Sequence, residues 1–140
     1  MRIGNFKKDL ELGQEIEKIA QEKLINHLNN NITIINTNND FKYDFKLSNN
    51  LKYEVKYDRM SIITGNIFIE FYCRGKLSGI STSESDFYII AYTDKDLYLI
   101  ETETLKKLIN NKEYMRPYED AIKSGYLFKK NIITLNSTKL

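Results

Sequence analysis

Residues 41–58 read FKYDFKLSNNLKYEVKYD, and the order of polar and apolar side chains in this stretch predicts a β-hairpin. Side chains on a strand alternate between its two faces. In the second run the apolar side chains stand at odd positions, so Glu54 and Lys56 share the opposite face. In the first run Phe45 is in phase with its apolar neighbours, and Asp44 lies on the other face. The hairpin therefore gathers two carboxylates and a lysine on one side.

The length of the hairpin loop decides which residues lie opposite each other. A loop formed by residues 48–50 places Phe45 opposite Tyr53 and Asp44 opposite Glu54. A two-residue loop would shift the register and mix the polar and apolar faces, so the pattern favours the longer loop. Like charges opposite each other destabilise a sheet. We therefore expect a compensating cation, supplied in part by a nearby lysine and more fully by a divalent metal ion.

Length and composition limit the class of protein. A chain of 140 residues is the size of one domain, and we expect residues 1–140 to form a single one. The 21 basic and 19 acidic residues nearly cancel, so net charge neither requires nor excludes a nucleic-acid partner. Cys73 is the single cysteine, so an internal disulfide cannot form. With His27 as the single histidine, the chain also lacks the ligands for a Cys/His zinc cluster. No run is apolar enough for a membrane helix or a signal peptide, so we expect a cytoplasmic, intracellular protein.

Upstream of the hairpin, apolar residues recur every four positions and predict a helix over residues 5–29. At about 100° per residue, Glu17 flanks the apolar stripe and faces the protein, whereas Glu15 points towards water. Glu17 could also be a helix-surface residue paired with a neighbouring side chain.

The remaining segments complete an α+β pattern. We expect strands at residues 32–37, 66–73, 87–92, 97–101 and 126–135, with short helices that begin near Thr102 or Thr104 and at Pro117. A helix, several adjacent strands, short helices and a last strand predict α/β/α layers around a central sheet.

Residues 74–85, RGKLSGISTSES, have the glycines and hydroxyls of a loop. Arg74, Lys76 and Ser78 in this loop, together with Arg59, are the candidate contacts to a nucleic-acid phosphate. The alternative interpretation of the same loop is an ordinary polar turn.

Asp44, followed after nine intervening residues by Glu54-Val55-Lys56, resembles the D…(D/E)-x-K signature of the PD-(D/E)XK nuclease superfamily. Residues 13–17, GQEIE, are similar to the G-x-x-x-E motif on the first helix of Holliday-junction-resolvase-like members. Residues 64–71, TGNIFIEF, and 78–82, SGIST, resemble a phage or viral branch of the superfamily. The matching segments span roughly two thirds of the chain.

This resemblance implies a restriction-endonuclease-like fold, with a central mixed β-sheet flanked by helices, and a metal-dependent endonuclease that acts on DNA. Asp44 and Glu54, with the backbone carbonyl of Val55, would bind Mg²⁺ or Mn²⁺. Lys56 would orient the attacking water and stabilise charge on the phosphate. Glu17 would complete the first metal site or assist a second ion.

Several alternatives stay open at the level of the sequence. The chain could be a catalytically silent DNA-binding or assembly module that keeps the fold, or it could hydrolyse RNA. Glu70 either reaches the site or pairs with an arginine. Branched or structured DNA is the substrate we consider first, and a homodimer that cuts both strands is a candidate assembly.

Overall fold

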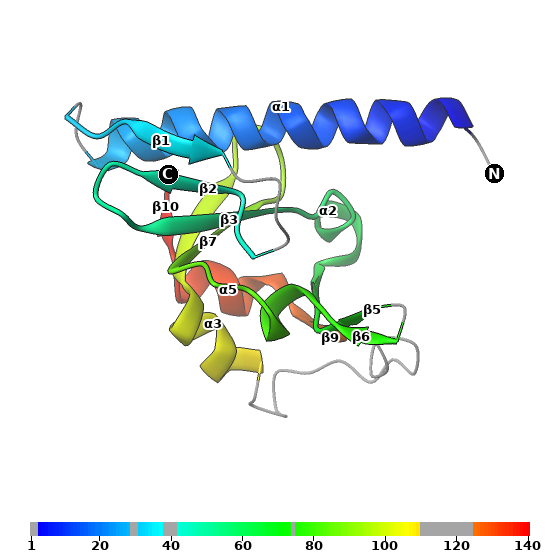
Figure 1. The fold of residues 1–140 in the computed structure, drawn as a ribbon. Helices are drawn as coiled ribbons and strands as arrows, with labels where there is room; N and C mark the ends of the chain where they lie inside the picture. The colour runs from blue at the N-terminus through cyan, green and yellow to red at the C-terminus, as the bar shows by residue number, and fades with distance from the viewer. Residues whose placement is uncertain (1–2, 29–30, 38–41, 74, 110–124) are drawn as a thin grey trace.

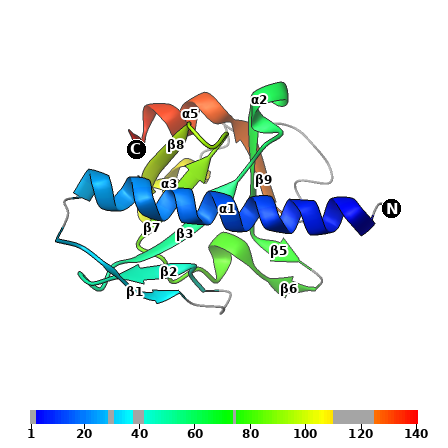
Figure 2. The same cartoon turned by 90° about the horizontal axis from the view of Figure 1, so that it is seen from above.

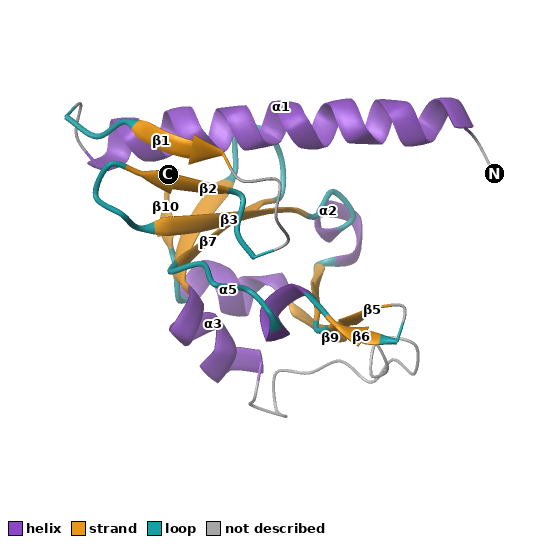
Figure 3. Cartoon of the chain, viewed as in Figure 1, coloured by secondary structure: helices purple, strands orange, loops and turns teal. Residues whose placement is uncertain are grey.

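The protein has an α+β fold, shown in Figures 1 and 3. The computed structural model describes residues 3–28, 31–37, 42–73, 75–109 and 125–140. Its helices are α1 (Ile3–Leu28), α2 (Ser61–Thr64), α3 (Thr102–Ile109) and α5 (Lys130–Leu135), with a 3₁₀ turn at Gly79–Ser81. The long first helix predicted from the sequence is confirmed. The helix predicted to begin at Pro117 lies outside the described residues.

A six-stranded mixed sheet forms the centre of the fold, in the order β1-β2-β3-β7-β8-β10. Its strands are β1 (Ile34–Thr37), β2 (Phe45–Leu47), β3 (Lys52–Tyr57), β7 (Phe87–Ala91), β8 (Leu97–Glu101) and β10 (Thr138–Lys139). The two central strands, β3 and β7, run parallel, whereas the other neighbours are antiparallel. The expected central mixed sheet is present, and β10 is a short strand that the sequence did not predict.

The hairpin of β2 and β3 has the predicted register. Phe45 pairs with Tyr53, and the backbone N–H of Leu47 donates to the carbonyl of Leu51 over 3.1 Å. Asn50 closes the three-residue loop with a left-handed φ of 68°. Asparagine tolerates this conformation better than most residues, which suits it to the last position of such a loop.

Helix α1 covers one face of the sheet, as the view from above shows (Figure 2). Ile16, Ala20 and Leu24 are buried there against apolar side chains of β2, β3 and β7. The opposite face packs against α3, α5 and a second layer of strands. Because β7 is buried on both faces, Ile89 points towards α1 and Ile90 points towards the second layer.

The second layer corrects the prediction of one continuous strand over residues 66–73. Strand β4 (Asn66–Glu70) pairs with β9 (Gly125–Lys129), and β5 (Tyr72–Cys73) pairs with β6 (Lys76–Leu77), in two small sheets apart from the central one. The break comes at Phe71, whose carbonyl accepts bonds from the Ser78 N–H at 3.0 Å and the Ser81 hydroxyl at 2.9 Å. The predicted loop that follows therefore contains β6 and the 3₁₀ turn, which lies against the end of β4.

The prediction of a strand over residues 126–135 was wrong in its second half. The strand ends at Lys129, and α5 begins at Lys130. A helical turn brings Ile133 into the core with no exposed surface, and the Thr134 hydroxyl donates to the carbonyl of Lys130 over 3.2 Å. Alternation in such a short segment cannot separate a strand from one helical turn.

None of the helices in the described segments is both long enough and apolar enough to cross a membrane.

The α1-facing core should dominate stability. We expect Leu47→Ala to lower the free energy of unfolding by about 2–5 kcal/mol, because it removes a fully buried side chain and leaves a cavity. The matched control is Leu135→Ala, at a side chain that is 78% exposed, which should change stability by less than about 0.5 kcal/mol. Urea titration of both variants measures the difference, and equal losses would contradict this description of the core.

Candidate active site

Glu54 and Lys56 line a cleft of about 200 Å³ between β3 and the second layer. Residues 54–56 of β3 form one side, and residues 68–70 of β4 form another. Gly79, Ile80 and Tyr88 complete the lining. Because β4 forms the wall across from the polar face of β3, the side chains of Glu54 and Lys56 are partly enclosed.

Asp44 lies directly before β2 begins, alongside β3, so it is outside the ladder of the two strands and is not paired with Glu54 as the hairpin register predicted. Its Oδ2 accepts a hydrogen bond from the Val55 N–H over 2.6 Å, and its own N–H donates to the Tyr53 carbonyl over 2.9 Å. The N–H and C=O of one strand residue point to the same side of the strand. The Val55 carbonyl is therefore directed to the edge where Asp44 lies, beside Glu54.

Three carboxylates come close enough for their charges to interact. Burial, followed by the charges of Asp44 and Glu17, raises the pKa of Glu54 to about 8. Burial also raises the pKa of Asp44, against the opposing effect of the Val55 N–H. The pKa of Glu17 is raised by burial and by Asp44. We call Glu17, Asp44 and Glu54 the acidic cluster.

The acidic cluster has the donor chemistry of a hard cation site. Oε2 of Glu54 is buried and has no hydrogen-bond partner among the described residues, and a buried polar atom of this kind is costly unless something binds it. Within the described segments, however, no three Asp, Glu, His or Cys side chains already form a metal-binding group. Magnesium needs only one or two carboxylates beside its waters, so Asp44 and Glu54 suffice chemically.

Glu17 and Glu15 occupy the positions expected from the helical pattern. Glu17 is partly buried and interacts electrostatically with the other two carboxylates, whereas Glu15 is exposed. The side of α1 that faces the sheet therefore brings a third carboxylate to the cluster.

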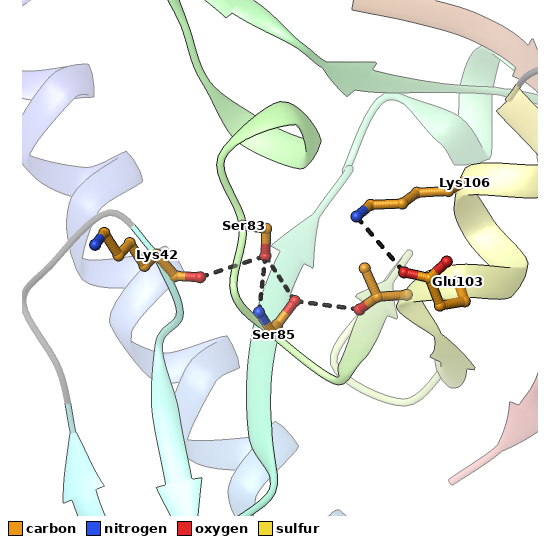
Figure 4. A network of polar contacts seen from close by, with 6 residues as sticks. Lys42, Ser83, Ser85, Glu103 and Lys106 are labelled. Carbon is orange, nitrogen blue, oxygen red and sulfur yellow. Dashed lines mark hydrogen bonds and ion pairs between the residues drawn. The ribbon is translucent and has the colours of Figure 1, made fainter.

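A network of hydroxyl groups fixes the loop behind the cluster (Figure 4). The Ser83 hydroxyl contacts the carbonyl of Lys42 at 3.3 Å and the hydroxyl of Ser85 at 2.7 Å. Ser85 in turn meets the buried Thr102 hydroxyl, at the start of α3, over 3.2 Å. The segment that leads into Asp44 is thus joined to α3 through residues 83–85.

Tyr88 is a cleft residue that the sequence did not single out. The parallel register of β3 and β7 places it beside Glu54. Burial raises its pKa to about 12, with Ser83 lowering it and the Glu54 and Asp44 charges adding to the rise. The phenol therefore stays protonated at neutral pH. No turn joins two parallel strands, so the sequence held no local signal for this register.

Glu70 reaches the cleft, which was one of the two placements left open for it. Its Oε2 accepts a hydrogen bond from the Ser78 hydroxyl over 3.0 Å. The approach is tight because Gly79, at a φ of 53°, lies where a Cβ would overlap the Glu70 carbonyl. Only glycine fits this backbone conformation and this contact without strain. The Ser78 hydroxyl, a candidate contact to phosphate, is the donor of this bond, and its contact to phosphate stays a prediction.

The two basic candidates among the described residues, Arg59 and Lys76, do not line the cleft. Arg59 is exposed directly after β3 and Asp58, and Lys76 is exposed on β6. Arg74 falls outside the described residues. Lys56 is the one cation among the described residues that line the cleft.

No protein-family model matches this chain, and no curated protein matches it. The case for a function therefore rests on the acidic cluster, Lys56 and the cleft.

The acidic cluster should make the metal-free protein less stable as pH rises. The folded pKa of Glu54, about 8, exceeds the ordinary glutamate pKa of 4.5, so between these values the folded state holds more protons than the unfolded state. Stability must then fall with rising pH. In EDTA we expect lower stability at pH 8.5 than at pH 6, and Glu54→Gln should stabilise the protein at pH 8.5 by about 1–3 kcal/mol.

Urea titrations at the two pH values measure this effect. Glu15→Gln, at an exposed position on the same helix as Glu17, is the control and should leave the pH dependence unchanged. A Glu54→Gln variant with the parent's pH dependence would show that the Glu54 carboxyl is not the titrating group.

Proposed function

We propose that this protein is a metal-dependent DNA endonuclease of the PD-(D/E)XK type, with a restriction-endonuclease-like fold. The observation that carries the proposal is the pairing of Glu54 with Lys56 in one cleft, while Asp44 bonds the Val55 N–H between them. The spacing D…E-x-K in the sequence thus corresponds to side chains that are neighbours in space.

Each residue has a role that suits its position. Asp44, Glu54 and the Val55 carbonyl would hold Mg²⁺ or Mn²⁺, since hard cations prefer oxygen ligands. Glu17 would complete the set or serve a second ion. A bound divalent ion supplies a more acidic water and neutralises charge on the phosphate.

Lys56 would act on the phosphate and on the water. Its ammonium group is the one cation of the described cleft lining, and it lies on the same strand face as Glu54. A fixed positive charge in a partly enclosed site stabilises a developing negative charge better than one in bulk water. Lys56 would therefore orient the attacking water and stabilise the oxyanion of the phosphate.

The enclosed carboxylates favour catalysis over a purely structural use of the fold. Burying three interacting carboxylates costs stability. Among the described residues, no ion pair with any of the three offsets this cost. A catalytically silent DNA-binding module would gain nothing from this cost. Intracellular location and a homodimer that cuts both strands stay predictions.

The direct test is cleavage of labelled DNA in Mg²⁺, on single strands, duplexes and branched junctions. We expect Lys56→Ala and Glu54→Gln to lower the cleavage rate by about a hundredfold or more, while thermal unfolding shows that both remain folded. Lys107→Ala, at an exposed lysine of α3 that does not line the cleft, is the control and should cut like the parent.

Full activity in both site variants would overturn the assignment of the reaction to Glu54 and Lys56, and no cleavage of any DNA by the parent would overturn the endonuclease. DNA binding without Mg²⁺ and without cleavage of any substrate would favour the silent module. Cleavage of RNA but not of DNA with the same sequence would make the protein a ribonuclease.

A further inference from the structure

Phe68 presents a partly exposed aromatic ring to the cleft, on the β4 side. It lies between Ile67 and Ile69, which are buried in the core, and so it points to the opposite face of β4 together with Glu70. Both Phe68 and Glu70 line the same cleft as Glu54 and Lys56. A flat apolar ring therefore stands across from the proposed catalytic residues.

The ring is held in place by the neighbouring strand. Gly125 of β9 pairs with Glu70, and the Phe68 ring lies over this glycine so closely that a Cβ there would overlap the ring. Gly125 is buried. Any larger residue at this position would displace the ring, so the close packing fixes its orientation on the wall of the cleft.

The size of the cleft limits what can reach Glu54 and Lys56. About 200 Å³ is less than the roughly 300–1,000 Å³ of typical small-molecule sites. The space is large enough for one flat base and cannot take a base-paired duplex between its walls.

The charge of the cleft favours a base over a second phosphate as the group that lies beside Phe68. Glu70 lies on the same face of β4 as the ring and would repel a phosphate, and Ile80 and Tyr88, which also line the cleft, carry no charge that would attract one. An uncharged base suits this wall, because every nucleobase has a flat face that stacks on an aromatic ring. The carboxylate of Glu70 can also accept a hydrogen bond from the amino group of a base.

We infer that Phe68 stacks on an unpaired base next to the scissile phosphate, so that the substrate is DNA with a single-stranded nucleotide at the cut site. The inference rests on the proposed function, because it names the substrate of that same cleft. A strand end, a flap or a branch point provides such a nucleotide, whereas an intact duplex must first release one.

The test measures binding by fluorescence anisotropy with Ca²⁺ in place of Mg²⁺. The probes are a labelled single-stranded oligodeoxynucleotide, its blunt duplex, and single strands in which each nucleotide in turn lacks its base. The variants are Phe68→Ala, Phe68→Leu and Phe68→Tyr, with Ile63→Ala as control, since Ile63 is 80% exposed on α2 and does not line the cleft.

We expect the single strand to bind more tightly than the duplex. Phe68→Ala and Phe68→Leu should raise Kd for the single strand about tenfold to a hundredfold, while Phe68→Tyr keeps the ring and the affinity. At one nucleotide position of the probe, removal of the base should weaken binding to the parent protein but leave binding to Phe68→Ala unchanged. Thermal unfolding checks each variant, and if Phe68→Ala does not fold, Phe68→Leu decides.

Equal affinity of the parent for the duplex and the single strand overturns base stacking. So does a Phe68→Ala substitution that lowers affinity by the same factor on every abasic strand, whichever base is missing. The two proposals can fail separately. Mg²⁺-dependent cutting of an intact duplex at the parent rate by Phe68→Ala would keep the endonuclease and reject the stacked base. Phe68-dependent binding without cleavage of any DNA would keep the base site and reject the endonuclease.

Discussion

The parallel pairing of β3 with β7 is the constraint on which the rest of the structure depends. It sets the hairpin carboxylate Glu54 beside Tyr88, and it directs the polar face of β3 towards the second layer and away from bulk water. Without it, the alternating charges of β3 would be an ordinary solvated face. With it, the same residues become the floor of a cleft, and their desolvation follows from the fold itself.

Burial of the carboxylates opposes stability and favours ion binding for the same physical reason. An enclosed carboxylate has lost its hydration, so the metal-free state is less stable. The same loss of hydration strengthens the attraction to a cation. Proteins commonly accept such local instability at functional sites and compensate in the core. Here the compensation is the apolar packing on both faces of β7, from Ile89 to α1 and from Ile90 to the second layer.

The sequence predicted the local parts of this site and missed the distant ones. Alternation and loop length were enough for the pairing of Phe45 with Tyr53, and helical periodicity was enough to orient Glu17 inwards. The placement of Phe68 and Tyr88 depended on contacts between segments far apart in the chain, with no turn to fix their register. Residues 66–73 were predicted as one unbroken strand because the break at Phe71 arises from tertiary hydrogen bonds to Ser78 and Ser81, which leave no signal in the local pattern.

The separation along the chain of the segments that meet in the cleft also determines when the site forms during folding. The β2–β3 hairpin closes through a short loop and can form early, whereas β4 must meet β9 across residues 71–124, about two fifths of the chain. A partly folded chain thus carries Glu54 and Lys56 on a solvated strand, with no enclosing wall. Glu54 becomes enclosed only once β4 has found its place in the second layer, so the raised pKa of its carboxyl is a property of the completed fold and not of the hairpin alone.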